Sequence, residues 1–281
     1  MTHEEIRRGY RKHAALAQFH RWYQLYENKA VPIDSQIDIL ADAVVIKSGL
    51  GEAKGHAAYR QRIAQLPATW KNAHFPRNIR VTPQADGDAT LTAEVTYLNE
   101  GMLPGAAIRK AELTYSTTLK GSETVLPVFT RVEITQNNEG TAETFKDAYA
   151  GNRVRSLLHY WFALIEDPAR RVEPFKEIFA AGYELKFSSG TISDTKTFEA
   201  WFRGPASAVV ASTHEVHKLE IEVVSPTEFK MSAEFAWEGL LPNDTPMSAR
   251  TGHRWLIEDN PKERFARIKS IDVEVLEPFS G

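Results

Sequence analysis

The sequence predicts an α+β protein in which one fold occurs twice, each copy a curved antiparallel sheet wrapped on N-terminal helices. Three observations predict this class. The chain matches itself at a shift of 139 residues, each half opens with helical periodicity, and each half ends in strands of alternating hydrophobicity. Helices followed by a run of adjacent strands are typical of an α+β layer.

The internal repeat sets the expected domain limits. The segment Thr2–Asn28 aligns without a gap on Thr141–Asp167, and the identical pairs include His20/His159, Trp22/Trp161 and Glu27/Glu166. The period is far too long for a solenoid, so we expect two globular copies, residues 1–137 and 138–281. The Asn/Gly-rich segment 134–144 is the expected seam, and its shortness favours copies that pack on each other as a pseudo-dimer.

The order of elements is the same in both copies. A first helix carries an aromatic stripe, and a second short helix, a brief strand and a third helix follow. The stripe consists of Phe19, Trp22, Tyr23 and Tyr26 in copy one, and of Leu158, Trp161, Phe162 and Ile165 in copy two. Four strands then complete each copy. In copy one, the elements after the first helix are expected near 34–40, 43–48, 55–67, 74–83, 89–99, 107–120 and 127–136, and copy two repeats them from 172 onwards.

Composition narrows the class of protein. With 34 Lys and Arg against 37 Asp and Glu among 281 residues, the net charge is −3, which gives no electrostatic reason to expect nucleic acid or an anionic membrane as partner. No apolar run is long enough to span a bilayer, and the charged N-terminus lacks a signal-peptide core. No cysteine is present, so thiolate chemistry is excluded. A cytoplasmic protein is expected.

The arrangement resembles the nuclear transport factor 2-like fold, particularly its SnoaL-like branch. That branch often begins its long strands with His-x-x-x-Asn, found here as His74 and Asn78, whereas copy two keeps His214 but has Lys218 at the Asn position. The resemblance implies two cones, each a sheet that curls round a pocket with helices closing one side. It also implies that further oligomerisation is possible.

The motif E-G-x-L-P occurs in both copies, at Glu100 and at Glu238. It lies where a long strand ends and the hairpin to the next begins. Gly suits the unusual φ of a turn, and Pro ends the strand pairing. The alternative is that these glutamates are pocket acids.

Strand parity sorts the side chains of the second long strand. Tyr97 shares one face with other apolar residues in copy one, as does Trp237 in copy two. These aromatic faces are expected to line the pockets. Glu94 and Glu234 fall on the opposite faces, so we do not expect them to be catalytic.

The first helix supplies candidates on the side that closes the cone. His20 and His159 lie three residues before Tyr23 and Phe162 respectively, and Trp22 and Trp161 belong to the same stripes. A pocket His beside Tyr23 suits acid–base chemistry near neutral pH. The alternative is a partly buried His whose ring nitrogens bond to the main chain.

The strands supply further candidates. In the family, a His at the position of His74 and His214 commonly faces the pocket, and an Asp at the position of Asp42 often lies at its rim. Copy two adds Arg250, His253 and Trp255 in one strand, where copy one has Tyr115 at the position of Trp255. We expect His74, His214, His253, Tyr23 and Asp42 to be catalytic. Substrate-binding residues are expected at His20, Trp22, Tyr97, Tyr115, His159, Trp161, Trp237, Trp255 and Arg250.

No motif in the sequence indicates a metal site or a cofactor. The chain lacks metal-binding H-E-x-x-H, dinucleotide-binding G-x-G-x-x-G and the phosphate-binding Walker motif, and its Gly-rich segment 49–55 is expected to be a loop. His214 and His217 are three apart on a strand and so point to opposite faces, which argues against a shared metal.

Two functions stay open. The resemblance implies a cofactor-independent cyclase, isomerase or dehydratase that acts on a small apolar molecule with pocket His, Tyr and Asp as acid and base. The alternative is a non-catalytic ligand-binding or protein-interaction module, because a fold alone does not determine function.

Overall fold

The computed structural model describes residues 2–84 and 87–280, and the chain divides into two compact units. We call Ala15–Arg153 the first-copy unit, and Met1–Ala14 together with Val154–Gly281 the second-copy unit. The domain limit between residues 137 and 138 stays a prediction.

The unit limits fall inside two helices, α1 (His3–Trp22) and α5 (Tyr149–Ile165). Each unit therefore includes a short helical segment that belongs, by the sequence repeat, to the other copy. Helix α1 begins with a capping box, in which Thr2 Oγ1 accepts from the Glu5 N–H at 3.3 Å and the Thr2 N–H donates to Glu5 Oε2 at 2.7 Å.

The first-copy unit contains a six-stranded sheet in the order β2-β1-β6-β5-β4-β3. Strand β1 runs parallel to β6, and the other neighbours are antiparallel. Its further elements are α2 (Gln24–Glu27), α3 (Ile33–Ile37), β1 (Leu40–Ser48), β2 (Gly51–Lys54), α4 (Gly55–Ala64), β3 (Lys71–Pro83), β4 (Ala89–Glu100), the 3-10 helix η2 (Pro104–Ala106), β5 (Ile108–Lys120) and β6 (Val128–Ala142).

The second-copy unit repeats this topology with the sheet order β8-β7-β12-β11-β10-β9, and β7 is again parallel to β12. Its elements after α5 are η3 (Glu173–Glu177), β7 (Phe179–Phe187), β8 (Gly190–Ile192), α6 (Thr195–Arg203), η4 (Pro205–Ala208), β9 (Ala211–Ser225), β10 (Glu228–Leu240), β11 (Pro246–Glu258) and β12 (Arg267–Ser280). Both units are therefore α+β, as the sequence predicts.

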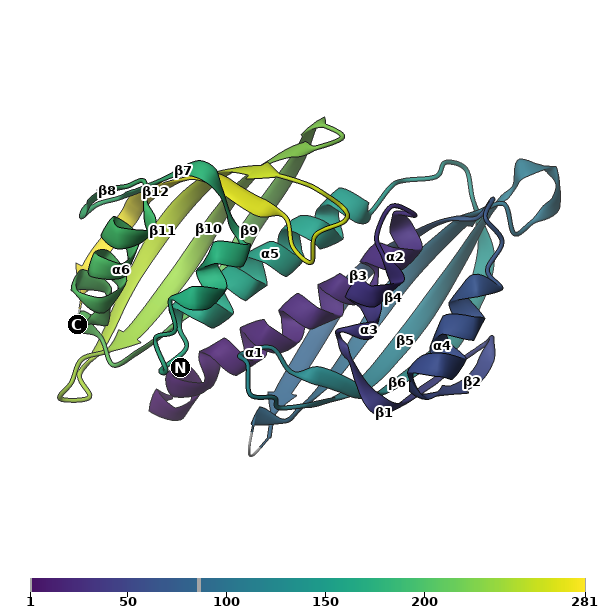
Figure 1. Ribbon diagram of the computed structural model, residues 1–281, viewed down its shortest axis with the longest axis horizontal. Helices are drawn as coiled ribbons and strands as arrows, with labels where there is room; N and C mark the ends of the chain where they lie inside the picture. Colours follow the sequence, from purple (N-terminus) through teal and green to yellow (C-terminus); the bar gives the residue numbers. More distant parts are fainter. Residues whose placement is uncertain (1, 85–86, 281) are drawn as a thin grey trace. The chain divides into compact units, whose positions relative to one another are not determined.

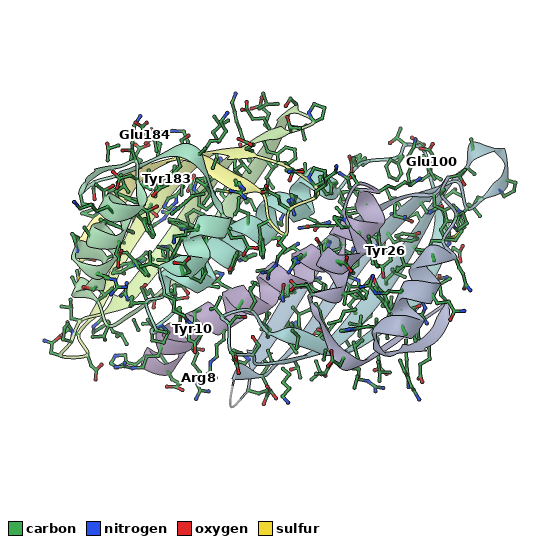
Figure 2. The ribbon with its side chains drawn as sticks, in the orientation of Figure 1. Arg8, Tyr10, Tyr26, Glu100, Tyr183 and Glu184 are labelled. Atoms are coloured by element: carbon green, nitrogen blue, oxygen red, sulfur yellow. The ribbon has the colours of Figure 1, made fainter. Side chains whose placement is uncertain are left out.

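In each unit the helices cover one face of the sheet (Figure 1). Their side chains fill the space between the helices and the strands (Figure 2). In the first-copy unit, fully buried Phe19 of α1 and Tyr23, between α1 and α2, meet Val95 of β4 and Phe129 of β6. Burial of such side chains stabilises a fold by about 1.5–3 kcal/mol each, so this helix–sheet layer is the core of the unit.

Strand register brings distant residues together on the covered face. His74 of β3 pairs with Tyr97 of β4, and Ala93 of β4 pairs with Tyr115 of β5. The predicted parity of β4 is confirmed: Ala93 is buried, whereas Glu94 is exposed. The covered face of this sheet therefore carries one His and two Tyr side chains.

Two segments of the first copy differ from expectation. Residues 134–142, expected as a seam, continue β6 as far as Ala142. The Gly-rich segment 49–55 contains strand β2, which forms a hairpin with β1, and Gly51 takes a φ of 90° at the turn. Asn and Gly lower strand propensity, but pairing along β5 outweighs that preference in β6. No helix in the described part of the chain is long and apolar enough to cross a membrane.

Candidate active site

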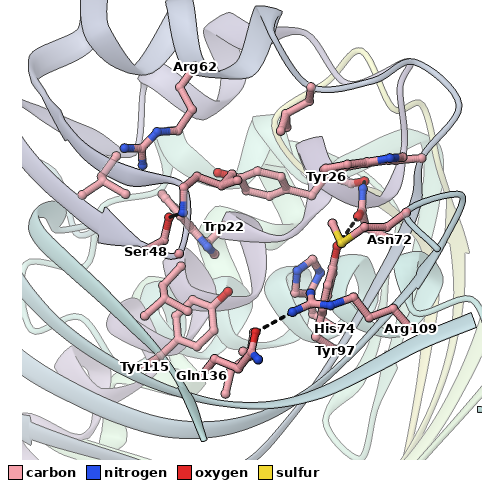
Figure 3. Close-up of a pocket in the computed structure, with 18 of the residues that line it drawn as sticks. Trp22, Tyr26, Ser48, Arg62, Asn72, His74, Tyr97, Arg109, Tyr115 and Gln136 are labelled. Carbon is pink, nitrogen blue, oxygen red and sulfur yellow. Dashed lines mark hydrogen bonds between the residues drawn. The ribbon is translucent and has the colours of Figure 1, made fainter. Parts of the chain in front are cut away.

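The first-copy unit contains a cavity of about 510 Å³ between its helices and the covered face of its sheet. Such a volume is within the usual range of small-molecule sites. Its walls are formed by helices α1, α2 and α4 and by the strands of this unit other than β2. Figure 3 shows lining residues such as Trp22, Tyr26 and His74. The apolar and aromatic lining residues are Trp22, Tyr26, Ile46, Leu50, Ile63, Leu66, Trp70, Tyr97, Met102, Leu103, Leu113, Tyr115 and Ile134.

A few polar side chains interrupt the apolar wall. Asn72 Oδ1 accepts from the Tyr97 hydroxyl at 2.7 Å, and the Asn72 amide donates to the Tyr26 carbonyl at 3.0 Å. The Arg109 guanidinium donates to Glu139 at 2.7 Å and lies 5.6 Å from the centre of the Tyr97 ring. These bonds hold the polar groups in place, so the cavity combines an apolar interior with fixed hydrogen-bonding positions.

The central polar feature of the cavity is a buried pair formed by His74 and Glu27. Nδ1 of His74 lies 3.1 Å from Oε1 of Glu27, and the His74 main-chain N–H donates to the same oxygen at 2.8 Å. The Glu27 side chain has no exposed surface, and His74 lines the cavity. An ionised Glu27 carboxylate only accepts hydrogen bonds, and with Glu27 in that form Nδ1 carries the proton. In the described part of the chain Nε2 of His74 makes no hydrogen bond, which leaves it for a molecule in the cavity.

Asn152, from the first turn of α5, completes this network. Its amide nitrogen donates to both carboxylate oxygens of Glu27, at 3.0 and 3.1 Å, and to the His74 carbonyl at 2.9 Å. Its Oδ1 lies 2.9 Å from Nδ1 of His20. All four residues thus belong to one buried hydrogen-bond network.

Burial determines the charge states around the pair. It raises the pKa of Glu27, and hydrogen bonds from His74 and Asn152 oppose that rise. Burial also raises the pKa of Tyr26 to about 12, and that of Tyr115 further. These phenols are therefore neutral near pH 7 and act as hydrogen-bonding or apolar wall groups.

The second-copy unit has an equivalent pair in Glu166 and His214. Nδ1 of His214 lies 2.9 Å from Oε1 of Glu166, and the His214 N–H donates to that oxygen at 2.9 Å. Burial raises the pKa of Glu166 well above its usual value and lowers that of His214 well below. Phe162 stacks on His214 with ring centres 4.2 Å apart, in the place of Tyr23 beside His74. Burial therefore disfavours the charged form of both members of this pair, which is packed among apolar rings.

The structure brings some predicted site residues together at the first-copy cavity. Trp22, His74, Tyr97 and Tyr115 line it. Tyr23 stacks on His74 with ring centres 4.7 Å apart, and His20 reaches the pair through Asn152. Asp42 lies apart, because its side chain is fully exposed near His56.

The copy-two candidates lie elsewhere. His253 is buried with Nε2 3.1 Å from the Thr251 hydroxyl, and the His159 ring is buried against His13. Trp161 and Trp255 are core residues in edge contact at 5.8 Å. Of the two remaining candidates, Arg250 forms ion pairs with Glu234 and Glu277 at a half-exposed position, and Trp237 contacts Phe279.

Sequence reasoning missed Glu27 and Asn152. The signal for Glu27 was present, since Glu27 and Glu166 are identical in the ungapped repeat and each precedes the strand His by a similar distance. Asn152 gave no such signal, because the residue at the equivalent position is His13. His56, near Asp42, also has a partner, since its Nε2 lies 3.0 Å from the Leu40 carbonyl.

Comparisons with solved structures find similar chains that each match about half of this one. A hexachlorocyclohexane dehydrochlorinase from Novosphingobium barchaimii is 11% identical, covers 46% of this chain and 86% of its own, and has a TM-score of 0.40. A candidate scytalone dehydratase from Novosphingobium aromaticivorans is 8% identical over 46% of this chain and 85% of its own, with a TM-score of 0.41. A nuclear transport factor 2-like superfamily protein from Salmonella enterica is 9% identical over 46% and 93%, with a TM-score of 0.40.

No protein-family model matches the chain, and no curated protein matches its sequence. The fold is therefore assigned from the architecture of the two units. Each has helices, a short strand that pairs in parallel with the last strand, a further helix and a four-strand antiparallel meander. The order of elements is the one that the resemblance implied, whereas the parallel pair makes each sheet mixed and not purely antiparallel as expected. The chain has the nuclear transport factor 2-like fold twice in tandem.

Proposed function

We propose that the first-copy cavity binds a small, largely apolar molecule and that His74, oriented by Glu27, moves a proton on it. The observation that carries the proposal is the buried His–carboxylate pair at the wall of an otherwise aromatic cavity. The walls are largely apolar, and a few fixed polar groups can orient the ligand, as small-molecule sites usually require.

The geometry supports a general base followed by a general acid. Nε2 of His74 takes a proton from a carbon or hydroxyl of the substrate, and the electron pair of the broken bond remains on the substrate. Glu27 accepts the hydrogen bond from Nδ1 and stabilises the imidazolium that forms. The imidazolium then returns the proton to another atom, which isomerises or cyclises the substrate, or gives it to a leaving group, which completes an elimination.

The similar structures agree with this class of reaction without defining it. A dehydrochlorinase and a candidate scytalone dehydratase both bear names of elimination enzymes. Our proposal for this chain is a cofactor-independent lyase or isomerase of the cyclase or dehydratase type. A ligand-binding module without turnover is the alternative that the experiment distinguishes.

The test is a screen of small aromatic and alicyclic alcohols and ketones, with binding and product formation followed by proton NMR. Leu113→Trp, which fills the cavity from β5, should abolish binding. His74→Gln should keep binding and lose turnover by about 10²–10⁴-fold, whereas His214→Gln should keep both. Compounds that bind with no product in any variant would establish the binding module instead, and binding that survives Leu113→Trp would place the site elsewhere.

A further inference from the structure

We infer that Asn152 is the positioning residue that allows His74, paired with Glu27, to act as a base. His13 stands at the equivalent place beside the Glu166–His214 pair and does not give that pair the same support. The inference rests on the proposed function of the first-copy cavity. It adds that the duplicated site works in one copy only, and it names the exchange of residues responsible.

Asn152 and His13 occupy equivalent places in the two networks. The repeat places one on the other at the shift of 139 residues. Asn152 bonds to the ring of His20 at 2.9 Å and to the carbonyl of His74 at 2.9 Å. His13 bonds to the ring of His159 at 2.9 Å and to the carbonyl of the strand histidine, His214, at 3.0 Å. The two residues therefore bridge corresponding groups.

The two side chains differ in the donors that they offer the carboxyl group. An amide nitrogen has two hydrogens, so Asn152 can give one to the His74 carbonyl at 2.9 Å and share the other between the two oxygens of Glu27 at 3.0 and 3.1 Å. An imidazole nitrogen has at most one. Nε2 of His13 gives its hydrogen to the His214 carbonyl at 3.0 Å and lies 3.6 Å from Oε1 of Glu166. The carboxylate is thus stabilised by a side-chain amide in the first network only.

The donors determine which nitrogen of the strand histidine carries the proton. An ionised Glu27 can only accept, so His74 holds its hydrogen on Nδ1 and keeps a lone pair on Nε2. A protonated Glu166 instead donates to Nδ1 of His214, which then carries its hydrogen on Nε2. A histidine that acts as a base needs a lone pair on Nε2, the ring nitrogen that is not bonded to the carboxyl group. Of the two strand histidines, only His74 has it there.

Other groups around the pairs do not reverse this assignment. Tyr23, Tyr26 and Tyr97 surround His74, and burial raises the pKa of each phenol. Around His214 lie Phe162, Phe235 and two further histidines, His13 and His253. Burial lowers the pKa of both histidines to about 3, so near pH 7 neither supplies a charge that would hold Glu166 ionised. The Thr213 side chain and the charge of Lys12 also lower the pKa of Glu166, but burial outweighs them.

The tautomers can be measured in the full chain without any substrate. Ring-¹⁵N histidine labelling with long-range proton–nitrogen NMR distinguishes the Nδ1–H and Nε2–H forms, and His74→Gln and His214→Gln assign the signals. We expect Nδ1–H for His74 and Nε2–H for His214 at pH 7. Asn152→His, which recreates the second network, should convert His74 to the Nε2–H form. Asn152→Ser, which removes the side-chain amide and its two N–H donors and leaves a smaller side chain, should do the same.

The reciprocal variant is His13→Asn, which should convert His214 to the Nδ1–H form. Circular dichroism confirms that each variant is folded. The inference is overturned if folded Asn152→Ser keeps the wild-type His74 tautomer, or if both histidines share one tautomer in the wild type. Because no turnover is involved, these outcomes are independent of the catalytic proposal: the tautomers can be as expected in a protein that only binds its ligand.

Discussion

Two atoms of His74, the main-chain nitrogen and Nδ1 of the ring, contact the same oxygen of Glu27, at 2.8 and 3.1 Å. The main-chain bond fixes the carboxyl group to strand β3, and the ring bond fixes the histidine to the carboxyl group. The orientation of His74 at the cavity wall thus depends on one side chain at the end of α2.

The first prediction concerns that side chain. Glu27→Gln keeps the shape of the site but allows its amide to donate to Nδ1 of His74, which selects the wrong tautomer. We expect proton-transfer activity to fall by about 10²–10⁴-fold with the fold retained. Kinetics of any substrate found in the screen measure the loss. Glu166→Gln is the matched control and should leave activity unchanged; an equal loss in both variants would contradict the assignment.

The second prediction is a pH dependence of stability in the second-copy unit. Burial lowers the pKa of His253 to about 3, so the unfolded chain binds this proton near pH 6.5 and the folded chain only near pH 3. Stability that depends on neutral His253 is therefore lost as pH falls through this window, by about 1.4 kcal/mol per pH unit.

The variant His253→Gln removes that dependence. As pH falls from 6 to 4, its free energy of unfolding should increase relative to that of the wild type by about 1.4 kcal/mol per pH unit. Urea denaturation at each pH measures this difference. His217→Gln alters an exposed histidine and serves as control. Parallel pH profiles for His253→Gln and wild type would contradict the prediction.

The third prediction separates the two copies of E-G-x-L-P. Gly101 has a φ of 106°, so Gly101→Ala should destabilise the protein by about 1–3 kcal/mol through backbone strain. At Gly239 a Cβ atom would lie 2.4 Å from the ring of Trp237, so Gly239→Ala should move that ring and change its fluorescence. Gly140, with open space around it, is the control. Unfolding curves that match for Gly101→Ala and Gly140→Ala would exclude a strained turn.

Much of the fold follows from local pattern. Alternation in β4 places Ala93 inside and Glu94 outside, and the aromatic stripe of α1 does meet the sheet. The parallel pairing of β1 with β6 could not be read from the sequence, because it joins residues that are 86 to 89 positions apart, as in Leu40 with Phe129 and Val45 with Arg131. Strand β8 was missed because three residues give no period to detect.

The site was predicted less fully than the fold. Strand parity found Tyr97 and the family position found His74, and the two residues pair across β3 and β4. Asn152 lies in α5, which belongs to copy two by the sequence repeat, whereas its partner Glu27 belongs to copy one. The periodicity of one copy alone does not predict such a contact. Asp42 was carried over from the family position alone, and its fully exposed side chain shows that this position lies outside the cavity here.

The central claim is that His74 is a general base for a molecule held in the first-copy cavity. The most direct measurement is the exchange of α-hydrogens of 2-tetralone, a cavity-sized ketone, for solvent deuterium at pH 7, followed by proton NMR at concentrations where binding is observed. The account predicts that the wild-type protein and His214→Gln accelerate exchange equally, and that His74→Gln loses about 10²–10⁴-fold of the acceleration. Bound ketone that exchanges no faster with the wild type than with His74→Gln would contradict it.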